Sequence, residues 1–592
     1  MAMDSRAGQM AWVVLAVILA LEPLAAQARP EAQSVDFSAD AVMEHVRVLC
    51  RDIGVRRAST ADARKAAEYI AQNLTDLGVT VHRRALGEVE LPAVAVGPVR
   101  FFTASRRWFS DDNLWVEFQP ASPSGQKALL IMAHYDTVAY SPGAADNAAA
   151  VGIALELART LSVQAPARPV IVAFTAAEEQ RLAGARALRT ALSQDIGLAV
   201  SLDLIGAPGT LTINGASSLI GSAWLRYLAR VAEGADVTIA APVPHRVISR
   251  HLPQIERSDH GVFTRAGIPA VHLYTRPDGA VYLPYHTAFD TEARLDRASV
   301  LAAGRMVTGL ARAGSAFPQP SGDQGIWLPG TTVTVPAWLL WLLALALIAA
   351  IGHTLLALGR ARPGQRGPGL VLVMASYSAS WIFTWLVLWL HGRLVAHPMP
   401  WVHAPAIDVL AAVLLSGACF AMLLTALARR YSPVGENRYL LAALAMYLAV
   451  GALLLIVRTP ELACIPLAMA GLSSLLPRVR TGLALLVLYA LALVPLTWPL
   501  DPDFLREAVY NGFFRREIPL ALVLAVCVAP ASFAAVYVVR RLSPMPYPRV
   551  RLCALIAVIV IAAAIILTRE PSCTGQAFDA YNLTCELPGL GG

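Results

Sequence analysis

Charged residues are scarce in this chain. They make up 15% of its 592 residues, whereas hydrophobic residues make up 56% and the mean hydropathy is +0.54. This composition is too apolar for a soluble protein, so much of the chain is expected to lie in lipid. The apolar excess is concentrated beyond Val335, because the sequence up to about Ala316 has ordinary globular patterning. The sequence therefore predicts two regions of different character.

Cysteine is also scarce, and a basic stripe is missing. The seven cysteines are scattered and form no CxxC pair, which excludes a disulfide framework and a cysteine-ligated zinc site. The formal net charge is +7, but no basic stripe interleaved with aromatic residues is found, so we expect no nucleic-acid partner. The excess arginine lies largely in short loops between apolar runs, where it indicates membrane topology.

The amino-terminal segment, residues 1–28, has the features of a signal peptide. One arginine near its start is followed by an apolar core over Ala11–Leu21, by Pro23, and by the small-x-small cleavage pattern Ala26-Gln27-Ala28. A retained amino-terminal membrane anchor is the alternative. In both cases the domain that follows is expected to be exported.

Residues 29–316 predict one α/β domain. Helical spacing over Ser38–Cys50 and Ala61–Leu77 is followed by strand-like alternation over Val79–Arg84 and Leu114–Phe118. Strands and helices then alternate, which indicates a mixed, mostly parallel sheet flanked by helices. The predicted elements are Ala128–Ala133, Ala148–Leu161, Pro169–Phe174, Glu179–Ala191, Leu198–Leu204, Leu219–Glu233, Pro269–Tyr274 and the closing helix Glu292–Ala311.

A Gly-, Pro- and Thr-rich linker, residues 317–336, precedes an all-α transmembrane domain of about eight helices, residues 337–568. The expected spans are Ala337–Leu358, Gly369–Leu390, Pro405–Leu427, Leu440–Val457, Leu462–Leu476, Leu483–Leu496, Pro519–Val539 and Cys553–Leu567. The loops predicted inside carry twelve arginines and those outside carry six, which fits the positive-inside rule. The tail, residues 569–592, is then exported, and Cys573 and Cys585 are predicted to form a disulfide there.

Polar residues that follow buried strands mark the expected site. His134-Tyr135-Asp136 ends the first parallel strand, and Asp146 lies in a loop before the next helix. The carboxyl ends of parallel strands are where α/β folds place their ligands. Further candidates are Glu178-Glu179, Asp203, Asp259-His260 and the segment from Tyr285-His286 to Asp290. Histidines with carboxylates and no cysteine suit hydrolytic zinc, and a shared carboxylate permits a two-metal clamp.

These motifs, in this order, resemble the co-catalytic di-zinc aminopeptidase family that includes aminopeptidase S and aminopeptidase Y. The resemblance covers roughly Ser38 to Ala311, and the attached apolar segments are similar to the membrane-bound members of the endoplasmic reticulum and the fungal vacuole. It implies a zinc-exopeptidase-like fold, peptide substrates and two zinc ions per chain. The implied ligands are His134 and Asp203 for one ion, Glu179 and His286 for the other, and Asp146 as the bridge.

The resemblance also implies the remaining roles. Glu178 would be the general base, and Tyr285 would donate to the oxyanion. Asp136 and Asp290 would accept hydrogen bonds from the second nitrogens of the two histidines. A cis peptide after Asp146 is implied as well. Ala148-Ala149-Ala150 stands where many family members have a Ser-Gly pair, which affects no ligand.

Simpler interpretations of single motifs remain open. A lone HxD is commonly a surface turn, and paired glutamates before a helix are commonly first-turn charges. Ser258 or Asp259 is as well placed to cap a helix as to support the site. His245, His251 and His272 are expected to be structural, and Asp408 and His353 to lie at the membrane interface.

The predicted function is a multi-pass membrane exopeptidase, most specifically an aminopeptidase, facing the periplasm or a lumen. No acidic residue for recognising a substrate amino terminus stands out, so the choice of aminopeptidase depends on the family alone. The alternatives are a glutaminyl-peptide cyclotransferase-like enzyme and a catalytically silent membrane receptor or scaffold. The preferred side chain and the oligomeric state are not predicted.

Overall fold

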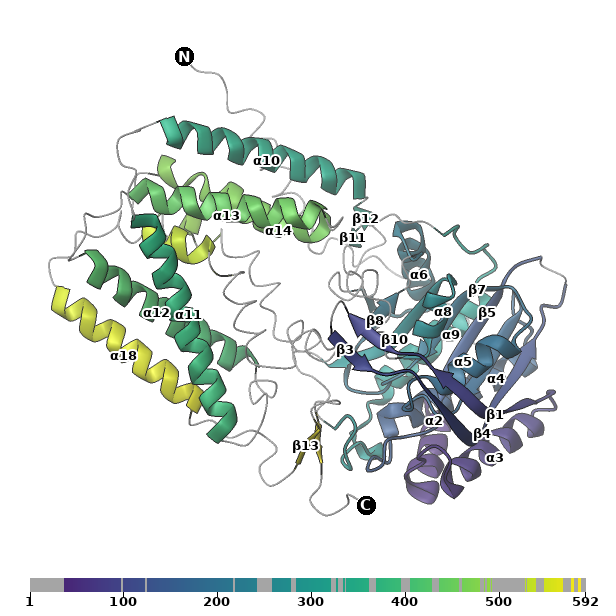
Figure 1. The fold of residues 1–592 in the computed structure, drawn as a ribbon. Coiled ribbons are helices and arrows are strands. Elements are labelled where there is room, and N and C mark those ends of the chain that lie inside the picture. The colour runs from purple at the N-terminus through teal and green to yellow at the C-terminus, as the bar shows by residue number, and fades with distance from the viewer. Residues whose placement is uncertain are drawn as a thin grey trace. The chain divides into compact units, whose positions relative to one another are not determined.

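The computed structural model describes two compact units, whose main boundary falls at residue 336 (Figure 1). The described residues are 37–320, apart from 97–98, 123–124, 217–218, 242–257 and 278–283, and then 326–327, 334–335, 337–360, 369–394, 405–428, 436–456, 460–479, 484, 487–489, 491, 528, 530–538, 548–567, 577–579 and 584–586. The predicted signal segment, His245, His251 and the predicted disulfide at Cys573 lie outside them.

An eight-stranded mixed sheet organises the first unit. Its strand order is β1-β4-β6-β5-β7-β10-β8-β9, and β6, β5, β7 and β10 are parallel neighbours. Antiparallel strands β1 and β4 extend one side, and antiparallel β8 extends the other. The sheet strands are β1 (His82–Leu91), β4 (Ser105–Phe118), β5 (Ala128–His134), β6 (Val170–Thr175), β7 (Ile196–Leu202), β8 (Gly209–Ala216), β9 (Ile239–Ala240) and β10 (Ala270–Pro277). The predicted α/β fold with a mostly parallel centre is confirmed.

Helices flank this sheet, and side-chain caps fix where several of them begin. The hydroxyls of Ser38 and Thr60 accept from backbone amides at the starts of α2 and α3, and Asp296 does the same for α9. A π-helical turn, Val48–Ile53, continues α2. The helices are α2 (Ala39–Arg47), α3 (Ala61–Asp76), α4 (Ala149–Val163), α5 (Ala183–Ala191), α6 (Ser222–Gly234), α8 (His260–Arg265) and α9 (Arg297–Arg312).

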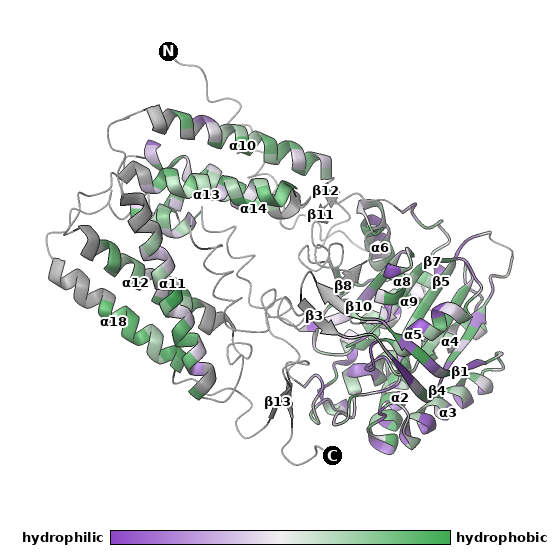
Figure 2. Cartoon of the chain, viewed as in Figure 1, coloured by the Kyte–Doolittle hydropathy of each residue, from purple (hydrophilic) through white to green (hydrophobic). Residues whose placement is uncertain are grey.

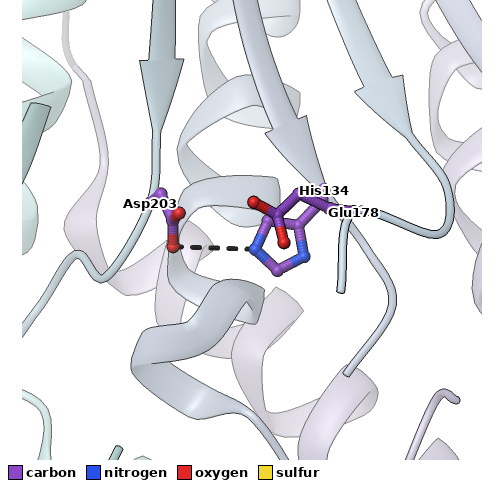
Figure 3. A group of neighbouring side chains, drawn as sticks. All are labelled: His134, Glu178 and Asp203. Carbon is purple, nitrogen blue, oxygen red and sulfur yellow. Dashed lines mark ion pairs between the residues drawn. The ribbon is translucent and has the colours of Figure 1, made fainter. Parts of the chain in front are cut away.

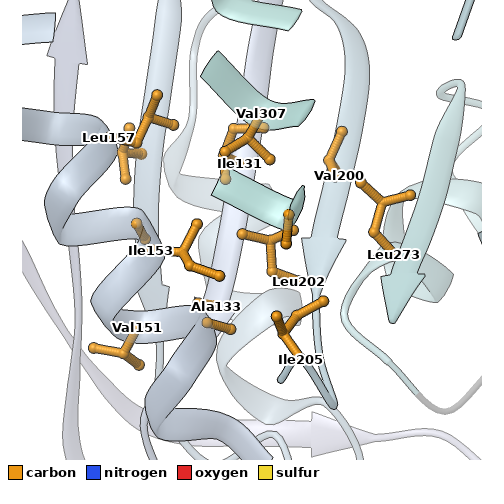
Figure 4. Packing of buried hydrophobic residues seen from close by; sticks show 14 of the residues in the cluster. Ile131, Ala133, Val151, Ile153, Leu157, Val200, Leu202, Ile205, Leu273 and Val307 are labelled. Carbon is orange, nitrogen blue, oxygen red and sulfur yellow. The ribbon is translucent and has the colours of Figure 1, made fainter. Parts of the chain in front are cut away.

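The core of this unit lies between the central strands and the helix that follows β5. Figure 4 shows Ile131 and Ala133 of β5 against Ile153 of α4, with Leu202 of β7 beside them. All four side chains are fully buried. Every residue of β5, β6 and β7 is buried, as expected for parallel strands covered on both faces. The strand ends are therefore fixed on a tightly packed support.

Several predicted boundaries are wrong. Strands β1 and β4 are far longer than the alternation at Val79–Arg84 and Leu114–Phe118 suggested, and a hairpin of β2 (Val94–Val96) and β3 (Val99–Phe102) connects them. Strand β8 was not predicted. Helix α5 begins at Ala183 rather than Glu179, because the three-residue stretch before it contains two left-handed residues. Helix α9 begins only at Arg297, after a separate 3-10 turn.

The second unit is helical. Its long helices are α10 (Ala337–Arg360), α11 (Gly369–Leu394), α12 (Pro405–Ala428), α13 (Glu436–Ile456), α14 (Pro460–Ser473) and α18 (Pro548–Leu567). Figure 2 shows that hydrophobic residues predominate along them. Among the described residues, one stretch, Tyr439–Ile456, is long and apolar enough to cross a membrane, and four apolar helices are shorter. The eight predicted spans stay a prediction, since Leu483–Leu496 and Pro519–Val539 are described only in part.

Candidate metal centre

The motif His134-Tyr135-Asp136 leaves the carboxyl end of β5. Nδ1 of His134 lies 3.1 Å from the backbone carbonyl oxygen of Asp136, and because a carbonyl can only accept, Nδ1 carries the proton. Nε2 of His134 is then a lone-pair donor aimed away from the strand. The Asp136 carboxylate accepts from the backbone amides of Glu178 and Glu179, at 3.0 and 3.2 Å. The Asp136 side chain thus connects the His134-Tyr135-Asp136 motif to the Glu178-Glu179 motif.

The loop after β5 presents Asp146 through a tight backbone. Gly143 has φ +62°, and a Cβ there would lie 2.2 Å from the backbone oxygen of Asp146, so only glycine fits. The peptide bond from Asp146 to Asn147 is cis, as the resemblance implied. The side chain of Asn147 donates to the carbonyl oxygen of Leu202 at 2.8 Å. This bond holds the loop against the end of β7.

The two glutamates lie in an irregular turn between β6 and α5. Ala177, Arg181 and Leu182 have positive φ angles, and the helix begins after them. Glu178 and Glu179 are therefore not charges in the first turn of a helix. The turn lets the two consecutive side chains lie among different neighbours, Glu178 near His134 and Glu179 beside His286.

The structure brings six of the predicted residues together, in two groups of three. Figure 3 shows one group, His134, Glu178 and Asp203. Nε2 of His134 lies 3.2 Å from Oδ1 of Asp146 and 3.6 Å from Oδ1 of Asp203. Nε2 of His286 lies 3.0 Å from Oδ2 of Asp146 and 3.1 Å from Oε1 of Glu179. The two carboxylate oxygens of Asp146 therefore face different histidines. Ligand atoms of His134, Glu178 and Asp203 lie within 4.8 Å of one another, and so do those of Asp146, Glu179 and His286.

These residues fit metal ions. Ligand atoms around a tetrahedral zinc, each about 2.0–2.1 Å from it, are roughly 3.3 Å apart, and the observed separations are 3.0–3.6 Å. Nε2 of both histidines and Oε1 of Glu179 are buried, and among the described residues they have no hydrogen-bond partner. Atoms that bind the same cation lie this far apart without forming hydrogen bonds to one another.

The buried negative charges at the site also favour the binding of cations. Glu178 and Asp146 are buried, and Glu179 and Asp203 are only 11% and 13% exposed. Buried carboxylates are paired or bind metals. Burial raises the pKa of Glu178 well above its usual range, and the nearby negative charges of Asp203 and Glu179 add to that effect, while His134 opposes it. Burial alone lowers the pKa of His286, but Glu179 and Asp146 raise it to about 10.

Two expected hydrogen bonds differ from the prediction. The second nitrogen of His134 contacts the backbone oxygen of Asp136, whereas the Asp136 side chain lies 3.6 Å from it. Asp290 was expected to accept from His286. Instead, its carboxylate accepts from the amides of Ala145 and Asp146 at 2.9 and 3.1 Å, and within the described residues Nδ1 of His286 has no hydrogen-bond partner. Asp290 is fully buried and supports the loop that carries Asp146 rather than the imidazole.

Tyr285 lies at the edge of the site and is half-buried. Its ring stacks on that of His286, with centroids 3.7 Å apart. His286 itself adopts φ +58°, a backbone conformation that non-glycine residues rarely adopt. The stacked rings and the turn at His286 place Tyr285 beside His286 at the edge of the site.

Asp259 and its neighbour support the strand ends. Asp259 precedes α8, but its side chain makes no capping bond. It accepts instead from the hydroxyl of Thr175, the last residue of β6, and burial raises its pKa to about 6. The hydroxyl of Ser258 bonds to that of Ser201 in β7. The capping interpretation is therefore wrong for both residues.

Arg56 is a residue that sequence reasoning missed. Its guanidinium is fully buried and donates to backbone oxygens of Tyr135, Pro142 and Gly143, at 2.9, 2.7 and 3.1 Å. It thus ties the start of the loop after β5, at Tyr135, to the part of the same loop just before Asp146. An arginine in a loop, here followed by Arg57, has no distinctive sequence signal. His272, expected to be structural, stacks on His260 and has its Nε2 3.4 Å from the backbone oxygen of Asp203.

Comparisons with known proteins agree with this arrangement. Residues 113–311 match the model of peptidase family M28. The uncharacterized protein YfbL of Escherichia coli is 26% identical over 288 residues, which are 42% of this chain and 80% of that protein. The vacuolar membrane protease of Schizosaccharomyces japonicus is 35% identical over 108 residues, but these are 18% of this chain and only 13% of the fungal protein.

Solved structures are similar to the chain at low scores. A zinc aminopeptidase from Bacillus subtilis matches with 17% identity and a TM-score of 0.39, covering 48% of this chain and 98% of that one. A glutaminyl cyclase from Bacteroides thetaiotaomicron matches with 18% identity and a TM-score of 0.38, covering 47% and 98%. These scores are too low to support an argument about function. The motif order and the match of residues 113–311 to the peptidase family M28 model together support a zinc metallopeptidase.

Proposed function

We propose that the chain is a membrane-anchored, two-zinc exopeptidase that removes residues from the amino terminus of peptides. The observation that carries this proposal is the position of Asp146, whose two carboxylate oxygens lie 3.2 and 3.0 Å from Nε2 of His134 and of His286. One carboxylate facing two lone-pair nitrogens is suited to two cations. In this arrangement His134 and Asp203 would hold one zinc ion, and Glu179 and His286 would hold the other.

The bound metals would polarise the substrate carbonyl and make water acidic enough to attack near neutral pH. Glu178 would act as the general base toward the attacking water. Its carboxylate lies near His134, and its backbone is held by the bond from its amide to the Asp136 carboxylate. It then passes the proton to the leaving amine, and such general-base catalysis contributes about 10²–10⁴-fold in rate. Tyr285 donates a hydrogen bond to the developing oxyanion.

The helical unit anchors the enzyme in a membrane. Support comes from its long apolar helices, from the arginine distribution among its loops, and from the fungal relatives, which are named vacuolar membrane proteases. We propose eight spans, with the peptidase domain on the exported side.

The test uses the full chain purified in detergent. We expect about two zinc ions per chain and hydrolysis of amino-acid anilides, with no hydrolysis of the same anilides after acetylation of their amino group. Cleavage of the acetylated compounds would exclude an aminopeptidase. Release of ammonia from glutaminyl peptides without peptide-bond cleavage would favour the cyclotransferase instead. If the protein turned over none of these compounds, the result would favour a catalytically silent membrane receptor or scaffold.

A further inference from the structure

Strand β4 continues past the end of its neighbour β6. Only Leu114–Phe118 of β4 pairs with β6, in antiparallel register with Leu114 opposite Phe174. Residues 105–113 continue beyond, paired with β1 alone. Because β4 and β6 are antiparallel, this free part projects past the carboxyl end of β6, which is the edge where Glu178 follows. We call residues 84–113 the arm, and its two longer strands, β1 and β4, are the long purple pair in Figure 1.

The base of the arm is fixed to the backbone around the glutamate turn. Asn113 is fully buried. Its Oδ1 accepts from the amide of Ala176 at 3.0 Å, and its Nδ2 donates to the carbonyl oxygen of Gly184 at 2.8 Å. These two bonds bracket Glu178 and Glu179. The arm and the turn that carries Glu178 and Glu179 are therefore fixed relative to each other.

Further along, arginines join the arm to the same turn. Arg107 donates from Nη1 to Oε1 of Gln180 at 2.8 Å, and Gln180 is the residue after Glu179. From the turn, Arg181 donates to the backbone oxygens of Thr103 and Pro92, both at 3.1 Å. The guanidinium of Arg107 thus lies next to the ligand-bearing turn, within roughly three residue lengths of extended chain from Glu179.

The acidic residues of β1 lie on the face of the arm opposite Arg107, because Glu88 pairs with Trp108 and Glu90 with Arg106, whereas Arg107 pairs with Val89. Residues 91–110 contain three arginines and no acidic residue. Arg107 is exposed, and within the described part of the chain it makes no ion pair, since its partner Gln180 is neutral. A positive group at the rim of a site attracts carboxylates.

The proposed role of Glu178 indicates which part of the substrate lies next to the arm. This residue hands a proton to the leaving amine, so the part of the peptide beyond the cleaved bond lies on the Glu178 side. The arm adjoins the Glu178 turn. An extended peptide advances about 3.3–3.6 Å per residue, which brings the second or third residue beyond the cleaved bond to the guanidinium.

We propose that Arg107 is a specificity-determining residue that binds a carboxylate on the leaving part of the substrate. The substrate class is then short peptides with a carboxylate two or three residues beyond the cleaved bond. That carboxylate comes either from the free carboxyl terminus of the peptide or from an acidic side chain. The proposal rests on the exopeptidase function proposed above and adds a substrate class to it.

The experiment compares four tripeptides on the full chain in detergent: leucyl-alanyl-alanine, its carboxyl-terminal amide, and amides in which the third residue is aspartate or lysine. We expect kcat/KM for the free acid, for the aspartate amide, or for both, to exceed that for the neutral amide about fivefold, the upper end for an exposed ion pair. The two acidic compounds distinguish the two sources of the carboxylate. Added salt should shrink the preference, because it screens exposed charges.

Variants separate this role from a structural one. Arg107→Ala should reduce the ratio of acidic to neutral substrates to about one, and Arg107→Glu should turn the preference toward the lysine amide. Arg106→Ala is the matched control, since neighbouring side chains of a strand point to opposite faces, and it should keep the wild-type ratio. A ratio near one in the wild type, or an unchanged ratio in Arg107→Ala, would overturn the proposal. If the wild type cleaved none of the four peptides, the exopeptidase function itself would be wrong.

Discussion

Gly143→Ala tests how strictly the backbone places the Asp146 carboxylate, the proposed bridge between two metal ions. The new Cβ would lie 2.2 Å from the backbone oxygen of Asp146 and 2.5 Å from Cγ2 of Thr137. Contacts shorter than 3.0 Å essentially never occur, so the loop must open by at least 0.8 Å, the difference between 3.0 and 2.2 Å. A metal site tolerates displacements of only about 0.5 Å, and a misplacement of about 1 Å can cost roughly 10²-fold in rate.

The matched control is Gly78→Ala. Gly78 also has a left-handed backbone, with φ +71°, but a Cβ there meets nothing within 4 Å. Both substitutions carry the left-handed cost of about 1–2 kcal/mol in folding free energy, and only Gly143→Ala moves Asp146. We expect Gly78→Ala to keep its zinc content and kcat/KM, with a slightly lower unfolding temperature.

The assay measures zinc per chain by elemental analysis and kcat/KM with an amino-acid anilide. We expect Gly143→Ala to lose at least about a hundredfold in kcat/KM and to bind zinc more weakly. If Gly143→Ala kept its zinc and more than about a tenth of the wild-type rate, the argument that this glycine fixes the bridge would be refuted.

Three further predictions concern other parts of the chain. Asp290→Ala should lower the free energy of unfolding by about 2–6 kcal/mol, because two buried amides lose their acceptor at about 1–3 kcal/mol each; a half-inactivation temperature equal to that of the wild type would contradict this. Gln365→Cys should resist labelling from the outer face of intact cells, because the loop with Arg360, Arg362 and Arg366 is predicted to be cytoplasmic, and labelling there would reverse the topology. Mass spectrometry of the unreduced carboxyl-terminal peptide should show Cys573 bonded to Cys585, and two alkylatable thiols would exclude the bridge.

Much of the site could be predicted from sequence because it uses the ends of parallel strands. His134 directly ends the buried run of β5, and Glu178 follows β6 by three residues. The carboxyl ends of neighbouring parallel strands meet at one edge, so residues far apart in the chain converge there. Apolar runs mark such strands clearly in a sequence.

The supporting contacts could not be predicted, since they depend on pairings that leave no local pattern. Arg56 donates to carbonyl oxygens about 80 residues away, and any residue type supplies a carbonyl. Asp290 was expected to hold His286, yet it bonds to backbone amides of the loop that carries Asp146. The arm was missed because its strands extend beyond the sheet, where one-sided burial does not impose a regular alternation.

The most direct test of the account is Glu178→Gln, assayed for both turnover and metal. The substitution removes the base and keeps the shape of the side chain, while the proposed ligands His134, Asp146, Glu179, Asp203 and His286 remain. The account predicts two zinc ions per chain, as in the wild type, and loss of nearly all anilide hydrolysis, because general-base catalysis is worth about 10²–10⁴-fold. A variant that keeps more than about a tenth of the wild-type rate, or a wild-type enzyme that is active with a single zinc ion, would contradict it.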